Sequence, residues 1–206
     1  MLHIWGRLSS LNVRKVVWTA QELGLDFQRT DAGMAFGIVQ TPHYLAMNPN
    51  AKVPLLQDGE LVLWESNVMV RYLCAKHASG SLYPTDLAQR FNAERWMDWQ
   101  QTSFNPAGSP GFKQWIRTAP AERNSAVIAQ SQAATEPLLA LLDAHLSQQP
   151  YMAGATFTMA DIPLATDVQR WLALPQQRPT YPHVERWLAQ ITQRPASKGV
   201  LDLPLS

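Results

Sequence analysis

The pattern of apolar positions divides the chain into an α/β front and an all-helical back. In the front, short apolar runs that suit strands alternate with stretches whose apolar residues recur every three or four positions, as on one helix face. The Asp58-Gly59 pair between two apolar runs is typical of a hairpin turn. The predicted elements are, in order, strand Leu2–Trp5, helix Asn12–Leu23, strand Leu25–Thr30, a loop over Asp31–Thr41, strands Val53–Gln57 and Leu61–Trp64, and helix Ser66–His77.

Beyond residue 80 the pattern predicts helices alone. We expect one domain over residues 1–78, a linker over residues 79–86 and an all-helical domain over residues 87–206. The prolines between Pro106 and Pro110 predict a break after the first of these helices. The predicted helices are Asp86–Phe104, Pro120–Leu146 with a face of Leu138, Leu141, Leu142 and Leu146, Thr158–Leu172, and Tyr181–Thr192.

Composition narrows the class of protein. Of 206 residues, 46% are apolar and 16% are charged, against about 25% charged in ordinary soluble domains. The dense apolar content excludes a disordered chain, and the low charge favours some hidden surface such as a subunit interface. The formal net charge of +1 gives no electrostatic case for binding nucleic acid or an anionic membrane.

The cysteine count and the apolar stretches indicate the cellular compartment. The single cysteine, Cys74, excludes a disulfide scaffold, and its apolar helical neighbours predict a buried structural thiol. No apolar stretch reaches the about 18 residues of a membrane span, and the first residues lack a signal-like pattern. We therefore expect a cytoplasmic protein. The histidines show no metal-ligand spacing, so no metal is expected.

Two turns in the front half have groups that could bind a ligand. Arg7–Asn12 joins a strand to a helix, where unpaired backbone N–H groups and the helix dipole favour an anion. Its serines either cap the helix or donate a hydrogen bond to that anion. In Lys52-Val53-Pro54, a cis bond before Pro54 would leave the Val53 backbone free to pair with an extended ligand.

A third feature lies where a strand runs into a helix, at Trp64-Glu65-Ser66-Asn67. One interpretation is structural: Ser66 caps the helix and Glu65 lies beside its dipole. The other is a socket for an amino-acid head group, in which Glu65 takes the ammonium and the Ser66 hydroxyl and N–H take the carboxylate.

At these three features the chain resembles a cytosolic glutathione transferase over nearly its full length. The resemblance is carried by Ser10-Leu11-Asn12-Val13-Arg14-Lys15-Val16, by Asn48-Pro49-Asn50-Ala51-Lys52-Val53-Pro54-Leu55-Leu56, by Leu63-Trp64-Glu65-Ser66, and by Phe157-Thr158-Met159-Ala160-Asp161-Ile162. The similarity is to bacterial members that use serine or asparagine, of theta, nu or beta type. It implies a thioredoxin-like N-terminal domain, β-α-β-α-β-β-α, followed by an all-α domain. Thr158 and Asp161 have capping-box spacing, so we assign this pair to folding.

The resemblance implies glutathione as co-substrate. Val53 would pair through its backbone with the cysteinyl part, with Pro54 in cis. Glu65 and Ser66 would hold the γ-glutamyl group. The glycyl carboxylate would face Lys52, together with residues from the neighbouring loop, for which the candidates are Gln40, His43 and Asn50.

The group that activates the glutathione thiol has three candidates. The first twelve residues hold no Tyr and no Cys, which disfavours the branches of the family that use them. Ser10 falls where serine-type transferases keep their hydroxyl, and a one-residue slip in the turn would put Ser9 there. Asn12 resembles the asparagine of some bacterial members that reduce disulfides.

The back half is expected to form the wall for the second substrate. Phe112 and Trp115 follow the predicted proline break, and Trp99 and Phe104 precede it; each either lines a pocket or packs in the core or a dimer interface. The resulting prediction is a homodimeric transferase that conjugates glutathione to a small hydrophobic electrophile. The alternatives are a glutathione-dependent disulfide reductase or peroxidase, and a non-catalytic binding protein of the same fold.

Overall fold

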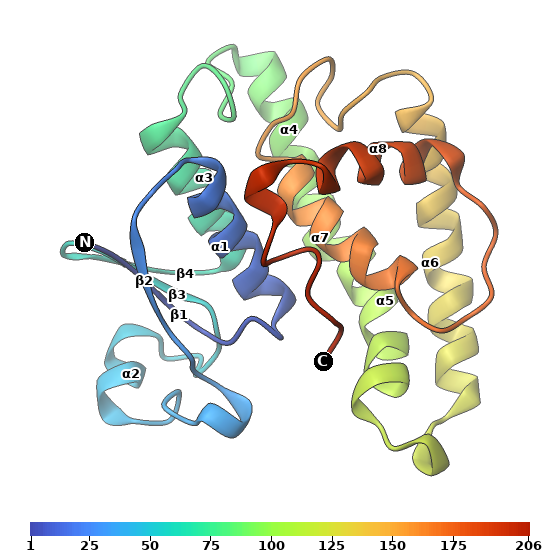
Figure 1. Cartoon of the computed structure of the whole chain (residues 1–206), viewed down its shortest axis with the longest axis horizontal. Coiled ribbons are helices and arrows are strands. Elements are labelled where there is room, and N and C mark those ends of the chain that lie inside the picture. The colour runs from blue at the N-terminus through green and yellow to red at the C-terminus, as the bar shows by residue number, and fades with distance from the viewer.

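A computed structural model describes all 206 residues and contains a mixed four-stranded sheet followed by a helical half (Figure 1). The strands are β1 (Leu2–Trp5), β2 (Phe27–Thr30), β3 (Leu55–Asp58) and β4 (Leu61–Trp64), in the order β2-β1-β3-β4. β1 runs parallel to β2 and antiparallel to β3, and β3 runs antiparallel to β4. The predicted fold class, a thioredoxin-like domain with an all-helical domain, is confirmed.

Two helices cover the face of the sheet that is turned toward the helical half. They are α1 (Leu11–Glu22) and α3 (Ser66–His77), which contact each other (Figure 1). Val13, Val16 and Ala20 of α1 are fully buried, as the three-and-four spacing predicts. Burying this apolar face holds α1 in place, so the turn that precedes it has a fixed position relative to β1.

The segment between β2 and β3 differs from the residue pattern. A short 3₁₀ turn, Met34–Phe36, lies inside the predicted loop, and α2 (Pro42–Met47) follows it on the other side of the sheet (Figure 1). α2 begins with Thr41 as N-cap, whose hydroxyl accepts from the Tyr44 N–H at 3.3 Å. This helix is part of the order that the family resemblance implies, but a six-residue helix is too short to show in a periodicity.

The predicted break at Pro106–Pro110 is wrong. α4 (Leu87–Trp99) passes through a π-helical segment, Gln100–Phe104, into α5 (Asn105–Phe112), and a second π-helical segment, Lys113–Arg117, extends it. A π-helical stretch shifts the hydrogen-bond ladder by one residue, which makes room where a proline lacks its N–H. The helix therefore continues past the prolines, and its polar residues lie along the front half of the molecule.

The remaining helices are α6 (Ser125–Leu146), α7 (Asp161–Leu172) and α8 (Pro182–Thr192). α6 starts later than predicted, because Pro120–Glu122 forms a separate 3₁₀ turn and Asn124 caps the helix by accepting from two backbone N–H groups at 3.0 and 3.2 Å. Its leucine face is also shifted, since Leu141 is 46% exposed while Leu139 is buried. No helix of the structure is long and apolar enough to cross a membrane.

Asp161 organises the start of α7, as its spacing from Thr158 predicts. Its carboxylate accepts from the backbone N–H groups of Met152 and Thr158 and from the indole N–H of Trp187, each at 2.9 Å. Burial raises the pKa of Asp161 to about 6, although these donors oppose the rise. α7 in turn contacts α1. The Asp161 network therefore supports a helix on which the front half rests.

Candidate active site

A cavity of about 140 Å³ lies where the helical half meets the ends of β3 and β4. It brings together seven residues that the sequence singles out, among them Asn12 from the turn before α1. Sequence reasoning missed three lining residues: Asn48, Trp64 and Gln101. The predicted residues that line the cavity are Asn12, Asn50, Lys52, Val53, Pro54, Glu65 and Ser66.

Val53 lines this cavity, and its backbone polar groups are unpaired. The Val53-Pro54 peptide bond is cis, and neither the N–H nor the C=O of Val53 takes part in a backbone hydrogen bond. The preceding carbonyl, that of Lys52, is fixed by the Tyr44 hydroxyl at 2.7 Å and by the Asn48 side-chain amide at 2.8 Å. This loop therefore holds one unpaired strand-like residue ready for an extended ligand.

Glu65 and Ser66 lie at the start of α3, but Ser66 does not cap it. Glu65 is the N-cap residue and Ser66 is the first helical residue, so the structural interpretation of Ser66 as a cap is wrong. Glu65 has φ of 74°, a conformation that costs a non-glycine residue about 1–3 kcal/mol. Ser66 and Glu65 both line the cavity, at a helix start where the first backbone N–H groups lack intrahelical partners, and the Glu65 side chain is exposed. The pair has the donors and the charge that an amino-acid head group requires.

The turn before α1 leaves its polar groups free. Ser10 is the N-cap residue of α1, yet its hydroxyl makes no capping hydrogen bond. The Asn12 side-chain oxygen is buried and has no partner. A hydrogen bond from α1 fixes the turn: the Arg14 guanidinium donates to the Leu8 carbonyl at 2.7 Å. The first N–H groups of α1 add a positive field at the same place.

A second cavity, of about 190 Å³, lies between this turn and α5. Ser9, Ser10 and Asn12 line it from the turn, and Phe112 lines it from the helical half. Asn12 lines both cavities, so the two adjoin at this residue. A group held at this junction is in reach of ligands on both sides.

The expected aromatic wall is corrected by the structure, since Trp99, Phe104 and Trp115 line neither cavity. Trp99 packs against the rings of Trp96 and Phe104, with ring centroids 5.4 and 5.9 Å away. The Trp115 indole donates to the Gln176 side chain at 3.0 Å. These rings therefore belong to the packing alternative, and Phe112 alone of the four lines the second cavity.

Two further candidates also lie elsewhere. Gln40 and His43 are exposed and do not line the first cavity. Thr41 begins α2 and turns this stretch to the other side of the sheet, where the ring of His43 lies 6.4 Å from that of Trp5. Gln101 takes a place that no local motif indicates, because it comes from the π-helical segment of the other half.

A buried lysine connects the surroundings of the two cavities. Lys15 of α1 donates to the side-chain oxygens of Asn67, Gln100 and Gln101 at 3.1, 2.9 and 3.4 Å. Gln100 donates onward to Asp167 at 2.6 Å. Burial lowers the pKa of Lys15 to about 7, and the charge of Asp167 opposes the decrease. By contrast, burial raises the pKa of the Cys74 thiol to about 12, so this cysteine stays a protonated core residue.

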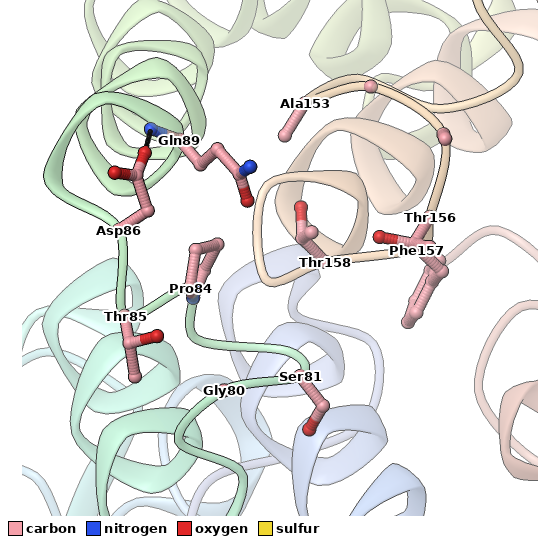
Figure 2. A pocket seen from close by; sticks show the side chains of 12 residues that line it. Gly80, Ser81, Pro84, Thr85, Asp86, Gln89, Ala153, Thr156, Phe157 and Thr158 are labelled. Atoms are coloured by element: carbon pink, nitrogen blue, oxygen red, sulfur yellow. Dashed lines mark hydrogen bonds between the residues drawn. The ribbon is translucent and has the colours of Figure 1, made fainter.

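The largest open cavity lies away from this chemistry. It has a volume of about 630 Å³ and lies between the linker and the loop Ala153–Thr158 (Figure 2). Its one acidic side chain, Asp86, already caps α4 by accepting from the Gln89 N–H at 2.9 Å (Figure 2). We therefore select the candidate site by its unpaired polar groups and not by volume.

These features define a class before any comparison: a thioredoxin-like domain with a cis-proline edge, joined to helices that complete its ligand cavities. The N-terminal domain model of glutathione S-transferases matches residues 1–75, and the C-terminal domain model matches residues 125–190. Glutathione S-transferase GstB of Escherichia coli K12 is 42% identical over 167 residues, which cover 80% of either chain. Glutathione S-transferase 3 of Zea mays is 35% identical over 78% of this chain and 73% of its own.

A solved structure gives the same result. The theta class glutathione S-transferase of Xanthomonas axonopodis pv. citri, with glutathione bound, superimposes with a TM-score of 0.96 at 45% identity, covering 100% of this chain and 99% of its own. The chain belongs to the cytosolic glutathione transferase superfamily of enzymes.

Proposed function

We propose that the chain binds glutathione in the first cavity and transfers its thiolate to a small electrophile in the second. The observation that carries the proposal is the junction at Asn12, where both cavities meet beside the free Ser10 hydroxyl. The thiol of a glutathione bound in the first cavity would face an electrophile bound in the second. The glutathione-bound Xanthomonas relative supports the identity of the first ligand.

The proposed pose follows from the unpaired groups of the first cavity. The γ-glutamyl ammonium binds Glu65, and its carboxylate binds the Ser66 hydroxyl and N–H. The cysteinyl backbone pairs with Val53 as an added strand would. The glycyl carboxylate lies toward Lys52 and Asn50, both exposed at the cavity rim. This pose points the cysteinyl side chain toward Asn12 and Ser10.

One hydroxyl is energetically enough to activate the thiol. A free thiol has a pKa of about 8.5, and lowering it by about 2 units requires about 2.7 kcal/mol. A hydrogen bond to a charged acceptor contributes about 1.5–3 kcal/mol, and the helix dipole adds about 0.3–1 kcal/mol. We assign the donor role to Ser10, since its hydroxyl is at the helix start and without a capping bond. Asn12 then orients the sulfur from the side.

The test measures binding and turnover separately. We expect wild-type protein to bind glutathione in a calorimeter and to conjugate it to an activated aryl chloride. Ser10→Ala should keep the binding and lose about 10- to 100-fold in kcat/KM, as the loss of a charge-assisted hydrogen bond requires. Ser9→Ala is the matched control, because it removes a hydroxyl from the same turn and should change kcat/KM little.

The outcomes separate the candidate functions. Turnover of a disulfide without turnover of any electrophile would replace conjugation with disulfide reduction, and Asn12→Ala would then be expected to have the larger effect. Failure to bind glutathione would contradict the proposal altogether and leave a binding protein of this fold.

We also propose that the chain forms a homodimer. The large apolar side chains of Leu87 and Phe91 are each 62% exposed and, four residues apart, share one face of α4. Covering this face would remove apolar surface from water. Light scattering should give a dimer for the wild type and a monomer for Phe91→Glu, and an unchanged dimer in the variant would place the interface elsewhere.

A further inference from the structure

The second cavity is cationic. Of the eleven residues that line it, four are cations: Arg7 from the turn, Lys113 and Arg117 from the second π-helical segment, and Arg170 from α7. None of the lining residues is Asp or Glu, and two are apolar. A wall built for an apolar electrophile would show the opposite composition.

The carboxylate of Asp167, which does not line the cavity, compensates part of this charge. Arg170 donates to Asp167 at 2.7 Å and also to the side chains of Asn105 and Ser109, at 3.0 and 3.3 Å. The other oxygen of Asp167 accepts from Gln100. These bonds fix the Arg170 guanidinium in one orientation. The Arg117 guanidinium donates to the main-chain oxygens of Ser9 and Ser206 at 3.4 and 3.2 Å, but no Asp or Glu side chain forms an ion pair with Arg7, Lys113 or Arg117.

Phe112 acts as a platform for two of these cations. The guanidinium carbons of Arg117 and Arg170 lie 4.9 and 4.8 Å from the centre of its ring. The ring is 5% exposed, so little of it is left for an apolar ligand. The aromatic residue that the sequence assigns to a hydrophobic substrate therefore positions positive charge instead.

The cations lie close enough to repel one another. The pKa of Arg117 is lowered, first by burial and then by the charges of Arg7 and Arg170. The Nε atom of Arg7 is buried and has no hydrogen-bond partner. Like charges held together with an unpaired donor cost free energy in the empty protein, and an anion bound among them relieves this cost.

We propose that the second substrate of this enzyme is a small electrophile that carries a carboxylate, which binds among Arg7, Arg117 and Arg170. This rests on the proposed transfer of glutathione and names its substrate class. With such a substrate, the thiol proton leaves to solvent, the thiolate sulfur forms a bond to the electrophilic carbon, and the leaving group departs with its bonding electron pair. The product is a thioether that keeps the carboxylate.

The carboxylate also orients the substrate. Arg7 and the Arg117 segment lie on the same cavity as Ser10 and Asn12, so an anion held there points the rest of a small molecule toward the sulfur. The volume of about 190 Å³ is below the about 300–1,000 Å³ of sites for drug-sized ligands. The cavity therefore suits a compact acid.

The test compares two glutathione conjugates that differ in charge alone. They are the products of glutathione with 4-chloro-3-nitrobenzoate and with its neutral amide, 4-chloro-3-nitrobenzamide. Calorimetry should show the carboxylate conjugate binding the wild type about 10-fold or more tightly than the amide conjugate, with a difference that shrinks at high salt. Because these are products, the comparison holds whether or not the protein proves to be a catalyst.

Variants locate the anion. In Arg117→Gln the preference for the carboxylate conjugate should fall to about twofold or less. Arg117→Lys should restore part of it, since the charge returns without the planar fork. Arg123→Gln is the matched control: Arg123 stacks on Trp115 at 5.2 Å, outside the cavity, and its loss should leave the preference intact.

Two results would overturn the inference. The first is equal binding of the carboxylate and amide conjugates to the wild type. The second is an equal loss of affinity for free glutathione and for the carboxylate conjugate in Arg117→Gln, since the cations would then serve glutathione itself. If instead the carboxylate preference holds while neither aryl chloride is turned over, the proposed conjugation fails and the anion site stands.

Discussion

The two cavities that meet at Asn12 are built in opposite ways. The first takes most of its lining from two short stretches of the front domain, residues 48–54 and 64–66, and presents backbone groups, one acid and one lysine. The second takes its charges from the turn before α1, a π-helical segment and α7, which are far apart in the sequence. The first is therefore built mainly within the front domain, with Gln101 as its one residue from the helical half, whereas the second takes most of its charges from the helical half and exists only once the two halves have packed.

This contrast explains how each responds to change. The first cavity should keep its shape as long as the residues of its own two stretches are unchanged. A site assembled from three elements depends on what holds those elements together, here the burial of α1 against α7 and the bonds that fix Arg170. Some mutations should therefore affect one cavity alone, and others should disrupt both.

The largest effect is expected from Asp161→Ala, which removes the shared support. Three buried donors lose their acceptor, at about 1–3 kcal/mol each, so the free energy of unfolding should fall by about 3–5 kcal/mol. Urea denaturation measures this. Asp26→Ala, an exposed carboxylate without a partner, is the control and should change stability by less than about 0.5 kcal/mol. A small loss for Asp161→Ala would show that α7 is held by apolar packing alone.

The next effect should separate the cavities. Glu65→Gln removes the charge that the ammonium of glutathione would meet, and glutathione affinity should fall about 10- to 100-fold in a calorimeter. The relative preference for the carboxylate conjugate over the amide conjugate should stay unchanged, because that preference arises in the second cavity. Glu60→Gln, in the exposed turn between β3 and β4, should leave glutathione affinity as it is. Equal effects of the two variants would mean that Glu65 does not touch glutathione.

A smaller effect concerns pH, through the buried lysine between the cavities. Burial lowers the pKa of Lys15 to about 7 in the folded chain, from an ordinary value of 10.5. Between these values the unfolded chain holds a proton that the folded chain lacks, so stability should rise with pH in this window. In Lys15→Met the rise should flatten, whereas the exposed control Lys198→Met should keep it. Parallel pH profiles for the wild type and Lys15→Met would show that Lys15 stays charged when folded.

The smallest effect should come from Trp115→Phe, which tests the corrected aromatic wall. The change removes the hydrogen bond to Gln176 and should cost about 0.5–1.5 kcal/mol of stability. Because the ring lines neither cavity, kcat/KM should stay within about twofold of the wild type. A large loss of kcat/KM at unchanged stability would return Trp115 to the substrate site.

The same contrast decides what could be predicted from the sequence. The strands, the helices α1, α3 and α8, and the cavity residues around Pro54 and Glu65 follow from local patterns, since each is set by neighbours a few residues away. Phe112 lines the second cavity, but the sequence predicts it as part of a hydrophobic wall, and its partners Arg117 and Arg170 lie 53 residues apart in the chain. No periodicity reports that two cations share one ring. The charge of the second cavity was therefore missed.

The proline-rich stretch shows the same limit in the fold. Pro106 and Pro110 remove backbone donors, which predicts a break, yet α5 continues through them. The π-helical segments on both sides absorb the disturbance, and they also carry Gln101 into the first cavity and Lys113 and Arg117 into the second. A shifted hydrogen-bond ladder has no signature in single residues, so the residue pattern predicts neither the continuous helix nor its site residues.

The central claim is that Ser10 holds the glutathione thiol as a thiolate at the junction of the two cavities. The most direct measurement is the ultraviolet absorbance of the thiolate in the glutathione complex, titrated with pH for the wild type, Ser10→Ala and Ser9→Ala. The account predicts a bound-thiol pKa about 2 units below the free value of about 8.5 in the wild type and in Ser9→Ala, and a return toward the free value in Ser10→Ala. An unchanged, lowered pKa in Ser10→Ala would contradict it.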